Sequence, residues 1–175
     1  DYFLSKQKSE KLIIKETSRK LDAVILNVAT IIGGRGMRGV QCDVFRKIAR
    51  GKMLFFPPGG SCFVYVMDVV DGMIAAWRKG CSGERYILGG YNMTFEEYFS
   101  KLADSFEARR PFIRIPGVLL PIGGFIAEKL SNYVGRDTAI LATGFGYYNS
   151  DKAIQELGYK ISPFEQAAES IRSNI

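Results

Sequence analysis

The stretch from Ala23 to Ile32 constrains the fold more than any other part of the chain. It reads AVILNVATII, a nearly continuous apolar run rich in branched side chains, bounded by Asp22 and Gly33. Such a run is typical of a strand that is buried on both faces within a parallel sheet. Helices must then cover both faces of that sheet, so the run predicts an α/β protein.

Helix-like and strand-like segments alternate along the chain, which supports that class. Mixed charged and apolar residues from Tyr2 to about Lys20 predict an amphipathic helix. Further helices are predicted over Val40–Arg50, Asp68–Lys79, from Thr94 onward, mainly over Val118–Val134, over Ser150–Leu157 and after Pro163, with a short helical turn over Thr138–Phe145. Strands are predicted over Cys62–Val66, Arg85–Leu88 and Phe112–Ile115, and the run LFFPPGG (54–60) is expected to turn.

The sequence also indicates where several helices begin and end. Gly51 and Gly80 are expected to end helices. Asp68, Thr94 and Ser150 are expected to cap helices with their side chains, and Glu97 would complete a capping box with Thr94.

Composition narrows the classes of function. The chain has 24 Lys and Arg against 18 Asp and Glu, a net charge of +6, but no aromatic residues interleave with the cations as in a nucleic-acid platform. The most apolar stretch, Ile115–Ala127, is too short and too interrupted by Pro and Gly to span a bilayer. We therefore expect neither a nucleic-acid nor a membrane partner.

The cysteine and histidine content excludes several kinds of catalytic and metal site. The chain has three cysteines and no histidine. An odd cysteine count without metal-type spacing predicts a reducing compartment, here the cytoplasm, and no disulfide framework. The absence of histidine excludes Ser–His and Cys–His nucleophiles and His-based metal sites in this chain, and no metal site is predicted.

One pair of residues near the start could carry acid–base chemistry. Tyr2 and Lys6, in YFLSK, are four positions apart, so on a helix they lie on one face about a turn apart. A nearby ammonium lowers the pKa of a phenol, which prepares it to exchange a proton with a carbonyl or hydroxyl group. Taken alone, this spacing is more often accidental than functional.

The order of motifs resembles the extended short-chain dehydrogenase/reductase family. After Y-x-x-x-K come KSEKLI, the strand ending NVATIIG, FVYVMDVVDGM (63–73), ERYILGGYNMT (84–94) and DKAIQELGY (151–159). The likeness covers essentially the whole chain and is strongest to the dihydroflavonol-reductase-like and nucleotide-sugar epimerase branch. It corresponds to the carboxyl-terminal part of such proteins.

The resemblance implies the second half of a Rossmann-type parallel sheet plus a small mixed α/β substrate-binding domain. Residues 1–36 would end the dinucleotide-binding domain, and 37–175 would mainly form the substrate domain, with 84–90 returning a strand to the Rossmann sheet. The implied activity is NAD(P)-dependent reduction or epimerisation at a carbonyl or hydroxyl carbon of a small molecule. A homodimer is also possible.

The resemblance also implies roles for individual residues. Tyr2 and Lys6 would be catalytic and would contact an NAD or NADP cofactor together with Asn27, Val28 and Ile31. Val28 stands where the family usually has proline. Asn27, Phe63 and Tyr65 would face substrate, although Phe63 and Tyr65 are equally well read as core aromatics.

Alternatives remain open at this point. Gly34, Gly36 and Gly39 form a literal G-x-G-x-x-G after a strand, but no acidic residue follows at the spacing a dinucleotide site needs, so we expect a flexible loop there. The glycine-rich turn and upstream Ser or Thr of the family are not in this sequence, so the chain by itself is expected to be inactive. A non-catalytic remnant, or a split module that binds a partner through an exposed sheet edge, is the alternative function.

Overall fold

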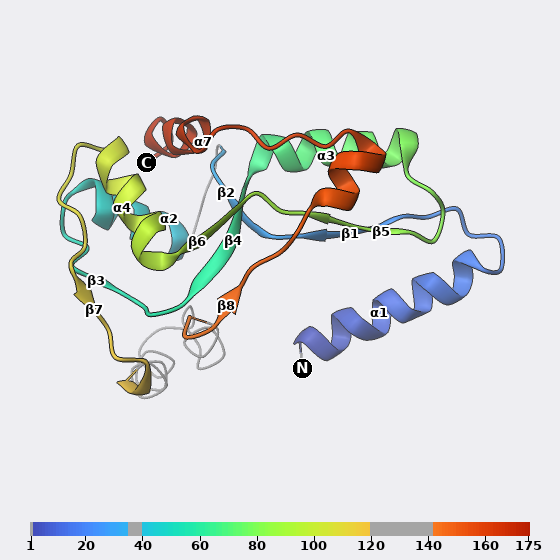
Figure 1. Ribbon diagram of the computed structural model, residues 1–175, viewed down its shortest axis with the longest axis horizontal. Helices are drawn as coiled ribbons and strands as arrows, with labels where there is room; N and C mark the ends of the chain where they lie inside the picture. Colours follow the sequence, from blue (N-terminus) through green and yellow to red (C-terminus); the bar gives the residue numbers. More distant parts are fainter. Residues whose placement is uncertain (1, 35–39, 120–141) are drawn as a thin grey trace.

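A computed structural model describes residues 2–34, 40–119 and 142–175, with the side chains of 2, 3 and 40 left out. It confirms the mixed α/β class with parallel strand pairs. Figure 1 shows two parts side by side: a layer of β1 and β5 between helices α1 and α3, and a second sheet with helices α2, α4 and α7 near it.

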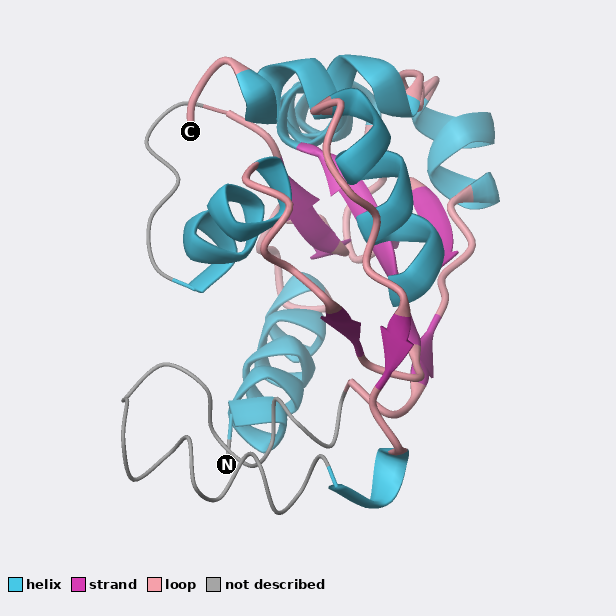
Figure 2. Ribbon diagram, turned by 90° about the vertical axis from the view of Figure 1, so that its left-hand side faces the viewer, coloured by secondary structure: helices cyan, strands magenta, loops and turns pink. Residues whose placement is uncertain are grey.

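The first part is a two-stranded parallel sheet. β1 (Ile25–Val28) pairs with β5 (Arg85–Leu88) in the register Ile25↔Arg85 to Val28↔Leu88. α3 (Val66–Lys79) lies on one face of this sheet and α1 (Tyr2–Thr17) on the other, as Figures 1 and 2 agree. A π-helical segment, η2 (Ala153–Leu157), packs against α3 and β5.

The second part is built on β4 (Gly60–Tyr65). It pairs in parallel with β2 (Thr30–Ile32) and β8 (Phe145–Gly146) and antiparallel with β6 (Tyr91–Thr94). Helices α2 (Val40–Ala49), α4 (Phe95–Ser105) and α7 (Phe164–Arg172) supply the rest of its core. β3 (Phe55–Phe56) and β7 (Ile113–Arg114) form a separate parallel pair, followed by the 3-10 turn η1 (Gly117–Leu119).

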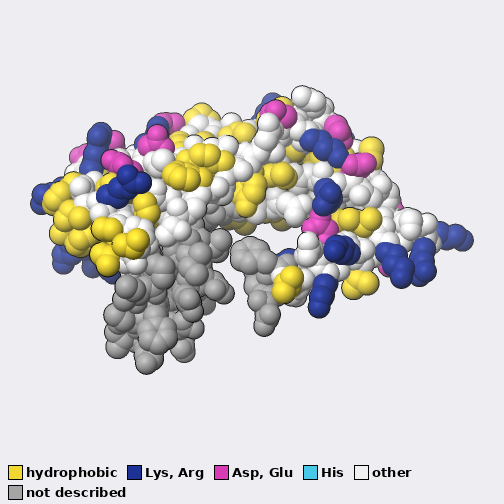
Figure 3. Space-filling view, turned by 60° about the horizontal axis from the view of Figure 1, so that its bottom comes forward, with side chains coloured by type: hydrophobic (Ala, Val, Ile, Leu, Met, Phe, Trp, Pro, Cys, Tyr) yellow, Lys and Arg dark blue, Asp and Glu magenta, His cyan; other side chains and the backbone are white. Residues whose placement is uncertain are grey.

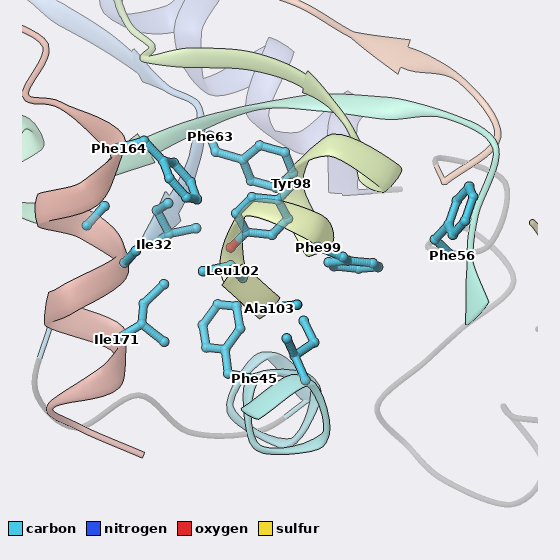
Figure 4. Packing of buried hydrophobic residues seen from close by; sticks show 13 residues of the cluster. Ile32, Phe45, Phe56, Phe63, Tyr98, Phe99, Leu102, Ala103, Phe164 and Ile171 are labelled. Atoms are coloured by element: carbon cyan, nitrogen blue, oxygen red, sulfur yellow. The ribbon is translucent and has the colours of Figure 1, made fainter. Parts of the chain in front are cut away.

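Aromatic rings fill the core of the second part. Figure 4 shows Phe63 from β4 stacked on Tyr98 from α4, with Phe164 of α7 and Phe45 of α2 nearby. The ring centroids of Phe63 and Tyr98 are 3.8 Å apart with an interplanar angle of 12°. Aromatic pairs of this kind contribute packing area that a small domain needs.

The expected single strand over 23–32 is wrong in its extent. The chain leaves β5 after the amide of Ala29 donates to the carbonyl of Leu88, and Thr30–Ile32 then pairs with β4 instead. The run therefore contributes one strand to each of two sheets. It is also not buried on both faces, because Asn27 and Ile31 are exposed.

Other segments also differ from expectation. The run LFFPPGG contains β3 and the first residue of β4 as well as a bend. Phe145–Gly146 is a strand rather than the end of a helical turn. Helix α1 does not gather its apolar residues on one buried face, because Leu4, Leu12, Ile13 and Ile14 are all exposed. The predictions over 120–141, and the loop at 35–39, lie outside the described residues.

Of the three expected caps, only Thr94 is confirmed. Its hydroxyl accepts from the amide of Glu97. The Glu97 carboxylate accepts from the amide and the hydroxyl of Thr94, and these two hydrogen bonds lower the pKa of Glu97. The Ser150 hydroxyl instead accepts from the amide of Gly89. Gly51 and Gly80 follow the ends of α2 and α3 as expected, Gly51 in the left-handed region and Gly80 in an extended conformation.

Asp68 was expected to cap α3, but it joins two distant segments. Asp68 is 4% exposed, and its carboxylate accepts hydrogen bonds from the amide and hydroxyl of Ser162, at 3.0 and 2.5 Å. Tyr91 donates its hydroxyl to the Ser162 carbonyl, so the turn before α7 is held at three atoms. Asp68 therefore connects α3 to a segment distant in the sequence and does not cap its own helix.

Replacing Asp68 by Ala should lower the free energy of unfolding by about 2–4 kcal/mol, because charge-assisted hydrogen bonds are lost and the Ser162 amide is left without its partner. Urea denaturation checks this. Asp71→Ala, at an exposed position one turn along α3, is the matched control and should stay within about 0.5 kcal/mol. Equal losses in both variants would contradict the role given to Asp68.

The Tyr98 hydroxyl is buried and has no hydrogen-bond partner among the described residues. Burial raises the pKa of this phenol, so it stays neutral. Because an unsatisfied buried hydroxyl is costly, Tyr98→Phe should raise the free energy of unfolding by about 1 kcal/mol. Tyr91→Phe, which removes a bonded hydroxyl, should lower it by a similar amount in the same denaturation experiment. Destabilisation by Tyr98→Phe would show that the hydroxyl has a partner.

Candidate functional site

The alternation of side chains along β1 assigns its residues to two faces. Leu26 and Val28 pack against the core cluster that includes Val69 and Ala76 of α3. Successive side chains of a strand point to opposite faces, so Asn27 points away from α3 and toward the face on which α1 lies. Its side chain is exposed there.

Helix α1 is tied to the same face. The carboxylate of Glu10 accepts from the guanidinium of Arg85 on β5 at 2.8 Å, and Arg85 pairs with Ile25 across the sheet. Tyr2 and Lys6 lie on α1 two turns and one turn before Glu10. The structure therefore places the predicted catalytic helix and Asn27 on one side of the β1–β5 sheet, with the side chain of Tyr2 outside the described residues.

Val28 and Ile31, the other predicted cofactor residues, do not share the position of Asn27. The side chain of Val28 is partly buried on the α3 side. Ile31 belongs to β2 and is exposed, and its carbonyl accepts from the Gln41 amide group at 3.0 Å. Val28 is the last residue of β1, so its backbone lies at the strand end beside Asn27 while its side chain points to the α3 side.

The two predicted substrate residues lie in the second part of the fold. Phe63 is 3% exposed and enclosed by the core around Tyr98. Tyr65 is partly buried, and its ring lies against Gly33, where an added Cβ would come within 3.0 Å of the ring. The enclosed ring of Phe63 favours a packing role, whereas Tyr65 retains some exposed surface.

An exposed aromatic segment at the sheet was not identified from the sequence. Ser150 holds the amide of Gly89, which directly follows β5, so the residues before Ser150 lie beside the carboxyl end of the β1–β5 pair. The exposed Tyr148 lies beside Gly89, whereas the hydroxyl of the exposed Tyr147 lies near Gly60 at the start of β4. Two hydrogen bonds between the side chain of Asn92 and the backbone of Tyr148 fix this segment. In the sequence, the aromatic-rich pattern GFGYY (144–148) was the feature that could have indicated this segment.

Helix α1 carries mainly positive charge. Figure 3 shows Lys and Arg side chains along the α1 side of the molecule. The residues of α1 that contribute are Lys6, Lys8, Lys11 and Lys15. Such a surface suits an anionic ligand. Within the described part of the chain, no group of three potential ligands could hold a metal ion, and no helix is long and apolar enough to cross a bilayer.

Comparison with curated proteins found relatives of this chain. It is 27% identical over 177 residues to a putative dihydroflavonol 4-reductase of Synechocystis sp., a match covering 95% of this chain and 52% of that protein. It is 35% identical over 121 residues to sterol demethylase protein B of Methylococcus capsulatus, covering 69% of this chain and 37% of that protein. The chain thus spans about half the length of the first of these relatives, and less of the second.

Solved structures share the fold. A nucleoside-diphosphate-sugar epimerase from Pseudomonas aeruginosa aligns with a TM-score of 0.77 at 18% identity, over 98% of this chain and 54% of that one. RMD from the same organism, solved with NADPH, aligns with a TM-score of 0.69 at 18% identity, over 98% and 54%. The model of the NAD dependent epimerase/dehydratase family matches residues 1–89, which include Tyr2, Lys6 and Asn27. The chain belongs to the NAD dependent epimerase/dehydratase family.

Proposed function

We propose that this chain is the proton-transfer and substrate-binding portion of an NAD(P)-dependent reductase or epimerase that acts on a carbonyl or hydroxyl carbon. The observation that carries the proposal is that α1, with Tyr2 and Lys6, shares one face of a parallel sheet with Asn27 at the end of β1. Ligands of open α/β sheets bind at the carboxyl ends of strands.

Each residue has a proposed task at that site. Tyr2 donates a proton to the carbonyl oxygen during reduction and accepts it in the reverse direction, while Lys6 favours the ionised phenol. Lys6 and Asn27 are the polar side chains on the α1 face that could bind the ribose and nicotinamide end of the cofactor. When bound, NAD(P) supplies or accepts the hydride.

The described residues fit one end of the cofactor but not the other. Asn27 is an exposed amide at a strand end, which suits a ribose or carboxamide group. Gly34, the described glycine of the G-x-G-x-x-G run, donates its amide to the Ser170 hydroxyl at 3.0 Å, so this donor is already engaged. We therefore propose that the pyrophosphate is bound outside this chain, and that the chain alone does not turn over.

Two features bear on domain assignment and substrate. The parallel pairing of β5 with β1 supports assigning 84–90 to the cofactor-binding domain with the part of 1–36 that ends at β1, whereas the pairing of β2 with β4 joins Thr30–Ile32 to the second sheet. Tyr148 offers exposed aromatic surface beside the carboxyl end of β5, which favours a substrate with an aromatic ring system. The putative dihydroflavonol 4-reductase has such a substrate in its name. Tyr65 remains a proposed substrate contact.

A label-transfer experiment tests the proposed activity. The chain is joined behind the part of the Synechocystis relative that lies outside their match, and the fusion is incubated with deuterated NADH or NADPH and a panel of aromatic ketones and nucleotide sugars. Deuterium transferred to the product carbon is the expected result. A fusion that folds and binds NAD(P), transfers no deuterium to any ketone, and with NAD converts no nucleotide sugar to its epimer, would contradict the enzyme assignment and favour the non-catalytic module.

A further inference from the structure

One end of the molecule combines exposed apolar side chains with positive charge. Figure 1 places β3, β7 and η1 at this end, on the opposite side of the molecule from α1 and β5. The large apolar residues exposed there are Phe55, Phe112, Ile113, Val118 and Leu119. Figure 3 shows hydrophobic side chains gathered at this end with Lys and Arg side chains around them. Exposed apolar patches with a polar border are typical of interaction sites.

The pairing of β3 with β7 brings the apolar residues together. Phe55 lies directly opposite Ile113. The next residue, Phe56, is buried in the core, so Phe55 points outward because successive side chains of a strand alternate between its faces. The turn η1 lies close by, since a Cβ added to Gly117 would be 3.6 Å from the ring of Pro58. The exposed apolar residues therefore form one group.

Basic side chains lie directly beside this group. The guanidinium of Arg109 is 4.5 Å from the ring centroid of Phe112. A Cβ added to Gly51 would be 3.6 Å from the Cβ of Arg109, so the chain around Gly51 runs next to that arginine. Arg50 and Lys52 precede and follow this glycine. Three cations thus meet at the border of the apolar residues.

Negative charge is scarce in the same two segments. Residues 50–58 and 107–119 contain five Lys or Arg residues and a single acidic residue, Glu107. One of the five, Arg110, pairs with Asp104 at 2.6 Å, which leaves four cations against one carboxylate. A surface with this surplus attracts a partner that carries negative charge.

We propose that this end, the basic–apolar end, docks on the surface of a membrane that contains anionic phospholipids. It consists of the five exposed apolar residues named above together with Arg50, Lys52, Arg109 and Arg114. Stable attachment to a membrane surface needs two signals, which are here apolar side chains that enter the headgroup boundary and cations that bind phosphate groups. Such attachment needs no spanning helix, so the proposal revises the expectation of no membrane partner, which considered spanning segments only.

Other occupants fit this end less well. One face of the Phe112 ring lies against Arg109, and the aliphatic side chains of Ile113, Val118 and Leu119 offer no surface on which a nucleic-acid base would stack. A second copy would place the same patch against itself, so cations would face cations across a two-fold axis. An anionic bilayer supplies negative charge and an apolar interior in one surface.

The orientation that follows is compatible with catalysis. Because β3 and β7 lie at the opposite end from α1 and β5 (Figure 1), docking through the basic–apolar end leaves α1 and the β1–β5 sheet away from the membrane. The candidate site would then stay accessible to a cofactor dissolved in water.

Sedimentation with vesicles tests the docking directly. We would use the fusion described above, so that every variant shares the same added part. One set of vesicles contains equal parts of phosphatidylcholine and phosphatidylserine, and the other contains phosphatidylcholine alone. We expect binding to be at least about tenfold stronger on the anionic vesicles, because each cation near an anionic membrane contributes to binding. Added salt should weaken this preference by screening.

Two matched pairs of variants test whether the basic–apolar end supplies both signals. Ile113 and Ile154 are 37% and 41% exposed. Ile113→Ser should weaken binding about fivefold because an apolar side chain is lost from the interface, whereas Ile154→Ser on η2 should leave binding unchanged. Arg109→Gln should also weaken binding about fivefold, whereas Arg78→Gln on α3 should not. Circular dichroism of each variant establishes that it folds.

Several results would overturn the proposal. The first is no binding to the anionic vesicles, and the second is an equal loss in both members of either pair, since overall charge or apolar content would then explain the attraction. Full binding by Ile113→Ser would show that the apolar side chains do not enter the bilayer. Duplex DNA that displaces the fusion from vesicles and binds Arg109→Gln more weakly would make nucleic acid the occupant. A dimer in light scattering that Ile113→Ser dissociates would make a second copy the occupant.

Discussion

Tyr2→Phe is expected to lower the rate of hydride transfer in the intact enzyme about 10²- to 10⁴-fold, the usual contribution of a positioned general acid. The ring is kept, so packing and cofactor binding should change little. Without the phenol, no group on the proposed site would hand a proton to the carbonyl oxygen as negative charge develops there. Single-turnover oxidation of NAD(P)H, together with a separate binding titration of the cofactor, measures both quantities.

Two variants on the same helix give this prediction its controls. Ser9→Ala removes a hydroxyl that bonds within the helix to the Ser5 carbonyl, and it should leave turnover unchanged. Lys6→Met should move the basic limb of the pH–rate profile to higher pH, because the pKa of the phenol rises when the nearby positive charge is removed. Turnover by Tyr2→Phe at the normal rate would exclude Tyr2 as the acid.

Phe63→Ala is expected to lower the free energy of unfolding by about 3–5 kcal/mol, the cost of removing a large buried side chain and leaving a cavity. The ring is 3% exposed and stacked on Tyr98, so the lost contacts are core contacts. A loss of this size is large against the total stability of a domain. Urea unfolding at constant temperature provides the measurement.

Phe63→Leu separates packing from a direct contact with substrate. It retains most of the apolar volume, so it should recover most of the stability that the alanine variant loses. Tyr65→Phe, which keeps its ring and removes only the hydroxyl, is the corresponding test at the partly exposed position. If Phe63→Leu were stable but raised KM strongly, Phe63 would face substrate after all.

Local signals in the sequence predicted those elements whose causes are local. The capping box at Thr94 and Glu97 depends on residues three positions apart, and the helix end at Gly51 depends on one glycine in the left-handed region. Both are present in the structure. The strands at β4 and β5 also follow from short apolar runs between turn residues.

Predictions that depended on distant partners were less successful. Asp68 stands where a helix cap is common, yet its carboxylate binds Ser162, which is far away in sequence. The apolar run at 23–32 predicted one strand, but the chain changes partners at Ala29 from β5 to β4. Neither the partner of Asp68 nor the change of strand partner at Ala29 is determined by neighbouring residues, because both depend on where distant segments lie.

The features of the candidate site also fall into those that neighbouring residues determine and those that distant contacts determine. The sequence by itself determined the Tyr2–Lys6 spacing, the α/β class and the family likeness, because periodicity and motif order are properties of neighbouring residues. Only the tertiary structure decided that Asn27 faces the side of α1 while Val28 faces α3, that Phe63 is enclosed in the core, and that Tyr148 lies beside the end of β5. Those facts depend on which face of a sheet a helix covers, and that is fixed by contacts between segments many residues apart.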